Sequence, residues 1–170
     1  MAITKIQSES LNLSDTYDFT GTVTGAGGVN TPAFYARAAS NQSVSDNTTT
    51  KVTLGTEDFD SDGKFADSRF TPTVAGKYFI FGHVFFDPGN ADDLVYGVSY
   101  IYKNGSQHNA AKIDFRNNAG RDATVPISTI IDLDADDYVE LYGTLNSADG
   151  SGQVFYANHY TFFGGYKIIE

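Results

Sequence analysis

The segment Gly76-Lys-Tyr-Phe-Ile-Phe-Gly-His-Val-Phe-Phe-Asp87 decides how this chain can fold. Side chains of a β-strand alternate between two faces. One face of this segment would carry Tyr78, Ile80, Val84 and Phe86, and the opposite face would carry Phe79, Phe81, His83 and Phe85. A strand in a two-sheet sandwich has only one face in the core. The second apolar face needs a cover, either a loop of the same chain or another copy, and we infer a homo-oligomer because exposed aromatic side chains favour aggregation.

The C-terminal segment repeats this two-faced pattern. Its alternation places Tyr160, Phe162, Tyr166 and Ile168 on one face, and Phe163 and Ile169 on the other. Combining the two segments, we predict that the contact between copies is formed by Phe79, Phe81, His83, Phe85 and Phe163.

Composition narrows the class of protein. The chain has 170 residues, 13 Phe, 11 Tyr and no Cys, and its formal net charge is −10. The length suggests one domain, and the aromatic content argues against disorder. The negative charge argues against nucleic acids and anionic membranes as partners, because both are bound by clustered Lys and Arg. The absence of Cys excludes disulfides, thiolate metal sites and a Cys nucleophile.

Short apolar runs separated by turns predict an all-β fold. The candidate strands are residues 33–40, 50–54, 64–71, 76–87, 94–103, 106–115, 124–133, 137–145, 153–158 and 159–168. No segment keeps a 3.6-residue period, so no long helix is expected. About ten strands in one domain predict an antiparallel sandwich, jelly roll or barrel.

One hairpin is specified in detail. Asn104-Gly105 is a strong signal for a two-residue turn, so Lys103 is expected to face Ser106. An unbroken register would then pair apolar residues on one face: Leu94 with Phe115, Tyr96 with Ile113, and Val98 with Ala111.

The first 32 residues differ from the rest of the chain. They are rich in Thr, Ser and Gly and end in a Gly-rich link before Pro32. We interpret residues 1–32 as an anchoring arm and residues 33–170 as the globular domain; the alternative is a frayed terminus without a role. The residues predicted to anchor the arm are Ile3, Ile6, Leu11, Leu13, Tyr17, Phe19 and Val23. The N-terminus lacks the apolar run of a signal peptide, which indicates folding in a cytoplasm.

Four pieces of the domain resemble the C1q-like family of jelly rolls, which is similar to tumour necrosis factor. They are Phe70-Thr-Pro-Thr-Val-Ala-Gly76-Lys-Tyr78, Lys51 to Leu54 followed by Phe59-Asp60, Leu133 to Leu141, and Phe163-Gly-Gly165-Tyr166-Lys-Ile168. The resemblance covers about residues 34–168. It implies a ten-stranded antiparallel jelly roll that assembles as a homotrimer, with the aromatic faces at the threefold axis. Ile80 and Gly82 stand where the family usually has aromatics, which weakens any inference of an immune or cytokine-like role.

The start of the chain resembles a different group. Ile3-Thr-Lys-Ile6 and Tyr17-Asp-Phe19-Thr-Gly21-Thr-Val23 are similar to the N-termini of tailed-phage virion proteins, where such an arm attaches a fibre or knob. The resemblance implies a structural virion protein assembled in the host cytoplasm, with other capsid or tail proteins as partners. A capsid decoration protein or head fibre is the leading hypothesis. The alternatives are a tail-associated protein that binds host glycans and a soluble lectin-like trimer.

Acidic clusters are the remaining chemical feature. Asp58-Phe-Asp60-Ser-Asp62-Gly63 matches the first half of an EF-hand loop, but Arg69 occupies the position of the bidentate Glu. We interpret this segment as an acidic turn and expect no cofactor; the alternative is a loose Ca²⁺ site that uses Asp60, Asp62 and a partner loop. A second acidic cluster contains Asp132, Asp134, Asp136 and Asp137, and a cation could bridge three copies of it near a trimer axis. No histidine spacing, nucleophile elbow or phosphate loop is present, so the sequence predicts a protein that is not an enzyme.

Overall fold

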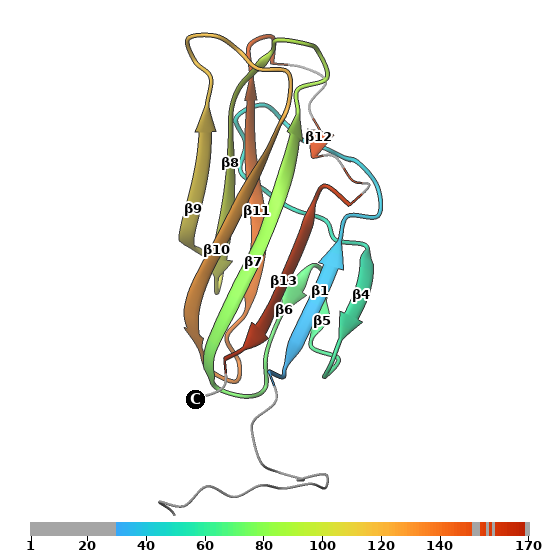
Figure 1. Ribbon diagram of the computed structural model, residues 1–170, viewed down its shortest axis with the longest axis vertical. Coiled ribbons are helices and arrows are strands. Elements are labelled where there is room, and N and C mark those ends of the chain that lie inside the picture. The colour runs from blue at the N-terminus through green and yellow to red at the C-terminus, as the bar shows by residue number, and fades with distance from the viewer. Residues whose placement is uncertain (1–29, 151–153, 156, 158, 169–170) are drawn as a thin grey trace, which may run out of the picture.

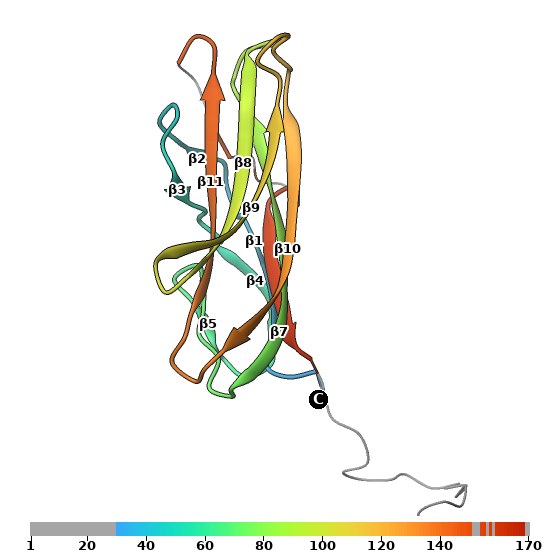
Figure 2. The same ribbon diagram turned by 90° about the vertical axis from the view of Figure 1, so that its left-hand side faces the viewer.

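The computed structural model describes residues 30–150, 154, 155, 157 and 159–168. Two antiparallel sheets pack face to face in these residues (Figures 1 and 2), which confirms the predicted jelly-roll sandwich. The strands are β1 (Ala33–Arg37), β2 (Gln42–Ser43), β3 (Thr50–Lys51), β4 (Thr56–Asp60), β5 (Phe65–Ala66), β6 (Arg69–Phe70), β7 (Gly76–Asp87), β8 (Leu94–Lys103), β9 (Ser106–Asp114), β10 (Ala123–Leu133), β11 (Val139–Ser147), β12 (Val154–Phe155) and β13 (Phe162–Lys167). The described part of the chain has no helix that could cross a membrane.

The first sheet is built around β7. This strand pairs with β10 along one edge, and with β13 and then β12 along the other. Strands β1 and β4 continue the sheet beyond β13, and β2 pairs with β12. The second sheet has the order β5-β6-β11-β8-β9, with β3 also paired to β11. The segment that dominates the sequence pattern is therefore central to the first sheet.

The core lies between the two sheets and is rich in aromatic rings. Phe34 of β1 stacks on Phe65 and Phe70, with ring centroids 5.1 and 4.3 Å apart. At the other end, Phe86 packs edge-on against Phe155 at 5.6 Å. The inward residues of β7, which are Tyr78, Ile80, Val84 and Phe86, are all fully buried. The alternation predicted for this strand is confirmed on its inner side.

The predicted hairpin is correct at its turn and wrong beyond it. Asn104 and Gly105 have φ values of 52° and 75°, as a type I′ turn requires, and Lys103 pairs with Ser106. A β-bulge between Ile101 and Tyr102 then shifts the register by one residue. Because a one-residue shift changes which side chains share a face, the predicted apolar pairs do not form, and Val98 lies opposite Lys112.

Two described strands were absent from the predicted set. Strand β4 has the sequence Thr-Glu-Asp-Phe-Asp, which lacks the alternation of a half-buried strand, yet it pairs with β1 at the edge of the sheet. Strand β2 has only two residues. Edge strands with mostly polar side chains are held in the sheet by backbone hydrogen bonds. Their sequences therefore show no alternation of apolar and polar residues by which they could be predicted.

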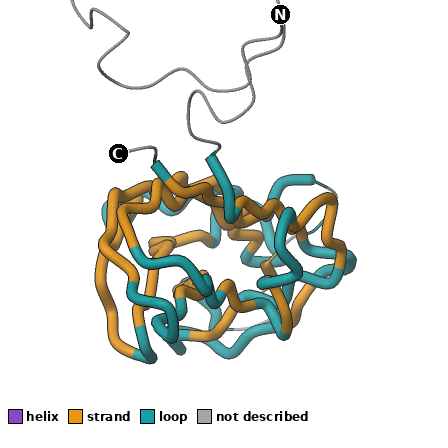
Figure 3. The backbone as a smooth tube through the Cα atoms, turned by 90° about the horizontal axis from the view of Figure 1, so that it is seen from below, coloured by secondary structure: helices purple, strands orange, loops and turns teal. Residues whose placement is uncertain are grey.

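The two ends of the sandwich differ. Ala33 pairs with Tyr166, so the start of β1 and the end of β13 lie together at one end (Figures 1 and 3). The loops after β7, β9 and β11 lie at the opposite end (Figure 1). Residue 30, where the described part of the chain begins, therefore lies near the end opposite these loops.

Candidate functional site

The outer surface of the first sheet carries a continuous group of aromatic side chains. We call it the outer aromatic face and define it as Tyr35, Phe59, Phe79, Phe81, His83, Phe85, Tyr160, Phe162 and Tyr166. They come from β1, β4, β7, β13 and the turn before β13. Four of the five residues predicted for contact between copies belong to it.

Ring contacts join these residues across strands. Phe81 of β7 lies 6.2 Å from Phe162 of β13 and 6.4 Å from Tyr35 of β1, measured between ring centroids. Tyr166 lies 5.7 Å from Phe79. Gly164 makes this close packing possible, because a Cβ there would lie 2.8 Å from the ring of Phe81. The face is therefore built into the sheet and does not consist of scattered surface residues.

Much of the face stays uncovered by the described residues. The exposed fractions are 54% for Phe59, 49% for Tyr160 and 36% for Tyr166. Ile130 of β10, on the same side, is 59% exposed. Water contact of this much apolar surface is unfavourable, at roughly 25 cal/mol per Å². The alternative of a covering loop finds no support in the described residues.

A groove of about 480 Å³ runs along this face between β10 and β13. Its lining residues are Phe79, Phe81, Gly82, His83, Pro126, Ile127, Ser128 and Phe162. The imidazole of His83 packs edge-on against Phe162, with ring centroids 3.9 Å apart, and its Nδ1 is buried without a hydrogen-bond partner. The groove is lined mostly by apolar side chains, and the imidazole of His83 is one of its few polar groups.

Phe163 is not part of the outer aromatic face, and its predicted role in contact between copies is wrong. Its side chain is fully buried and packs edge-on against Phe34 in the core, at 5.2 Å between centroids. The residue on the outer side is Phe162, which pairs with His83. Because both faces of β13 are aromatic, alternation alone could not tell which of them points inward.

The sequence prediction also missed several members of the face. Phe59 lies in the unpredicted strand β4, where its ring stacks on Tyr35 at 6.3 Å. Tyr35 alternates with the buried Phe34 and Ala36, which is the signal that could have placed it on the outer side. Phe162 and Tyr166 were placed together on one face by their spacing, but that face was assigned to the wrong side.

Three of the four aspartates considered as calcium ligands, Asp60, Asp62 and Asp134, form hydrogen bonds within turns. Asp60 accepts hydrogen bonds from the backbone amides of Asp62 and Phe65, at 3.3 and 2.6 Å. The backbone amide of Asp134 donates to Asp137, and Asp136 is exposed. In the described ranges no group of three or more His, Cys, Asp or Glu residues could hold a metal ion. These contacts support the interpretation as acidic turns.

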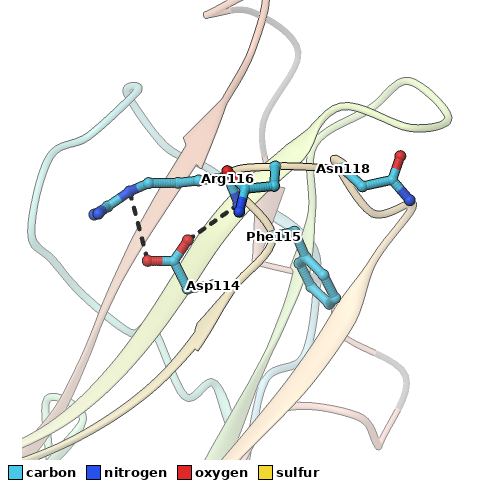
Figure 4. A pocket seen from close by; sticks show the side chains of 5 residues that line it. Asp114, Phe115, Arg116 and Asn118 are labelled. Atoms are coloured by element: carbon cyan, nitrogen blue, oxygen red, sulfur yellow. Dashed lines mark hydrogen bonds and ion pairs between the residues drawn. The ribbon is translucent and has the colours of Figure 1, made fainter.

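Another hollow, of about 670 Å³, lies beside the loop after β9 (Figure 4). It is lined by Asp114, Phe115, Arg116, Asn117 and Asn118, all from one segment. Arg116 faces Asp114 at 3.5 Å, and its guanidinium also lies 5.5 Å from the ring of Tyr96. The lining residues include no Ser, Cys or His.

Acidification is expected to weaken the domain through His83. Burial lowers the pKa of His83 below its ordinary value of 6.5, although a backbone hydrogen bond with Tyr160 acts in the opposite direction. The unfolded chain therefore protonates His83 more readily than the folded chain does. The contribution of His83 to the free energy of unfolding is fully present above pH 6.5 and is lost as the pH falls below that value. We expect a lower unfolding midpoint at pH 5.5 than at pH 7.5, and a smaller difference in His83→Gln. The control is His108→Gln, because His108 is exposed. If the unfolding midpoint differs between pH 5.5 and pH 7.5 by the same amount in His83→Gln and in His108→Gln, His83 is not the group that causes the pH dependence.

The topology is that of an antiparallel two-sheet jelly roll, and solved structures with a similar fold are of the C1q and tumour-necrosis-factor type. Among solved structures, the globular domain of zebrafish complement 1qA matches with a TM-score of 0.57 and 15% identity, over 82% of this chain and 98% of that one. Murine APRIL matches with a TM-score of 0.58 and 12% identity, over 80% of this chain and 98% of that one. Eiger TNF from S. frugiperda matches with a TM-score of 0.59 and 8% identity, over 81% of this chain and 92% of that one. No protein-family model and no curated protein sequence matches this chain. At these identities the similarity establishes the fold alone.

The predicted anchoring residues Ile3, Ile6, Leu11, Leu13, Tyr17, Phe19 and Val23 lie outside the described residues. The division into residues 1–32 and 33–170 therefore stays a prediction, with β1 starting at Ala33.

Proposed function

We propose that this chain is a non-enzymatic assembly protein: the knob of a homotrimer carried on a bacteriophage particle, most simply as a capsid decoration protein or head fibre. The outer aromatic face carries the trimer part of this proposal. An apolar sheet face with a groove and exposed rings is stabilised when sister copies cover it. The jelly-roll fold, established by the structural matches, supplies a rigid base for such a face.

The virion part rests on the N-terminal sequence and on where it enters the domain. Residues 1–32 resemble the arms by which phage proteins attach fibres or knobs. The start of β1 lies at the end of the sandwich opposite the loops after β7, β9 and β11 (Figure 1). An arm that holds the chain to a particle would leave these loops pointing away from it.

Those outward loops favour one further role. In a tail-associated protein they would contact host glycans, which is the second candidate function. The two candidates share the fold and the trimer, and they differ in where the particle carries the protein.

Deleting residues 2–24 tests the attachment. We expect the shortened chain to remain a folded oligomer of unchanged stoichiometry that no longer binds particles lacking their own copy of this protein. Electron microscopy of particles with the full chain restored locates it: projections on the capsid support the decoration role, and density at the tail supports host binding. Equal attachment of the shortened and full-length chains would refute the role of the arm.

A further inference from the structure

The outer side of the second sheet carries a patch of tyrosine and charged side chains. Its members lie next to one another across β3, β6, β8 and β11, and they are Lys51, Arg69, Tyr100, Tyr102, Glu140 and Tyr142. We call this group the tyrosine patch. Glu140 alternates with Val139 and Leu141, which are buried in the core, so it belongs to the outer side. The patch lies on the opposite side of the sandwich from the outer aromatic face, so sister copies on the first sheet would leave it open.

One carboxylate in this patch serves two cations. Oε1 of Glu140 accepts from Nζ of Lys51 at 2.7 Å and from Nε of Arg69 at 2.9 Å. The side chain of Glu140 is only 2% exposed, and this burial acts to raise its pKa. The hydrogen bonds from Lys51 and Arg69 outweigh the burial and hold the pKa of Glu140 below its ordinary value of 4.5. Glu140 is therefore ionised at neutral pH, and the three groups together keep one net positive charge.

Arg69 presents a positioned guanidinium to solvent. Its Nε is held by Glu140, and its guanidinium carbon lies 3.8 Å from the centre of the Tyr138 ring, which is a cation–π contact. Its terminal Nη groups make no hydrogen bond to any described residue, and 42% of the side chain is exposed. A guanidinium with a fixed orientation and uncommitted Nη groups is a binding group for carboxylates.

The tyrosine rings add aromatic surface with free hydroxyl groups. Tyr102 stacks on Tyr142 with 4.2 Å between ring centroids, and Tyr100 meets Tyr102 edge-on at 6.1 Å. In the described part of the chain, the hydroxyls of Tyr100 and Tyr102 have no hydrogen-bond partner. The outer aromatic face contains five Phe, whereas every aromatic residue of β8 and β11 is Tyr. Because a tyrosine has an apolar ring and a polar tip, the patch suits a hydrated ligand better than a dry contact between copies.

Charge favours an acidic ligand on this sheet. Its strands contain four Lys or Arg residues and two acidic residues, although the whole chain has a net charge of −10. The strands of the first sheet show the opposite balance, with three basic and five acidic residues. The patch spans three neighbouring strands that are about 4.8 Å apart, which gives it the breadth of a short stretch of sugar rings.

We propose that the tyrosine patch binds acidic glycans, whose sugar rings carry carboxylate groups. The carboxylate of one sugar binds the Nη groups of Arg69. The C–H face of the sugar ring packs on the tyrosine rings, and its hydroxyls exchange hydrogen bonds with Tyr100 and Tyr102. The choice of a glycan as the occupant rests on the second candidate function, and it moves the contact from the outward loops to the side of the sandwich.

Calorimetry on the full chain tests the patch with defined probes. These are tetrasaccharides of galacturonic acid, of hyaluronan and of sialic acid, with neutral maltotetraose and tetra-aspartate as controls. We expect at least one acidic tetrasaccharide to bind at millimolar concentration or below, and neither control to bind.

Variants of the full chain locate the binding. Arg69→Lys keeps the charge but removes the guanidinium, and Tyr100→Ala removes a ring and a free hydroxyl. Each should weaken binding by about tenfold or more, the usual worth of a hydrogen bond to a charged group. The matched control is Arg116→Lys, because Arg116 is 61% exposed and lies beside the ring of Tyr96, outside the patch. This control should bind like the parent chain.

Four outcomes overturn the proposal. None of the acidic tetrasaccharides binds, or maltotetraose binds as tightly as they do. Equal binding of tetra-aspartate would show that the patch takes an acidic peptide. Unchanged binding by Arg69→Lys, or loss of binding in Arg116→Lys, would place the site elsewhere. Binding to the parent chain is measured directly, so misfolding of one variant does not prevent the test.

A separate measurement distinguishes this site from the function on which it rests. Failure of all glycan probes would leave the trimer and the attachment by residues 1–32 untouched. Glycan binding by the purified chain, combined with normal adsorption of particles that carry Arg69→Lys, would support the site and remove its role in contact with the host.

Discussion

Phe81→Asp is expected to convert the assembled protein into folded monomers. Phe81 lines the groove and contacts Phe162 and Tyr35, so it lies at the centre of the outer aromatic face. An aspartate there would place a carboxylate of each copy in an apolar contact, where it is neither paired nor hydrated. The inward side of β7 is untouched, so the core should persist.

Light scattering coupled to size exclusion measures the result. The parent chain should run at three times the mass of one chain, and Phe81→Asp at the mass of one. The matched control is Ala110→Asp, which adds the same charge on the exposed edge strand β9 of the other sheet and should stay trimeric. A parent chain that remains a monomer at high concentration, or a trimeric Phe81→Asp variant, would rule out this face as the assembly surface.

Phe163→Ala is expected to lower the free energy of unfolding by about 3–5 kcal/mol, the usual cost of truncating a buried aromatic side chain. Phe163 is fully buried, and its ring lies beside Phe34 and against Gly82. Replacement by alanine leaves a cavity between β13 and β7, and backbone pairing on both sides of β13 limits how far the sheet can close over it.

Chemical denaturation in the Phe81→Asp background isolates this loss, because assembly would otherwise add to the measured stability. The control is Tyr166→Ala, on the same strand but on the outer side, which should change monomer stability by less than 1 kcal/mol, as is usual for surface substitutions. If Phe163→Ala proves as mild as Tyr166→Ala, Phe163 does not have the core position described above.

The strand pattern of the domain was largely predictable from sequence. The ten predicted segments overlap described strands because alternation, Gly-rich turns and β-branched or aromatic residues all favour the same structure. Strand β4 escaped prediction because its pairing with β1 is a backbone interaction that polar side chains do not signal. The β-bulge in the hairpin was not predicted either, because counting residue pairs outward from the Asn104-Gly105 turn assumes that every residue of one strand pairs with one residue of the other.

By itself, the sequence determined that β7 is apolar on both sides and that the chain is all-β. Only the tertiary structure decided which aromatic side of β13 is the core side, and which aromatic residues of β1 and β4 join the outer face. The physical reason is that alternation specifies two faces but not their direction. Direction is set by the second sheet, which covers one of the two faces, and its strands come from other parts of the chain.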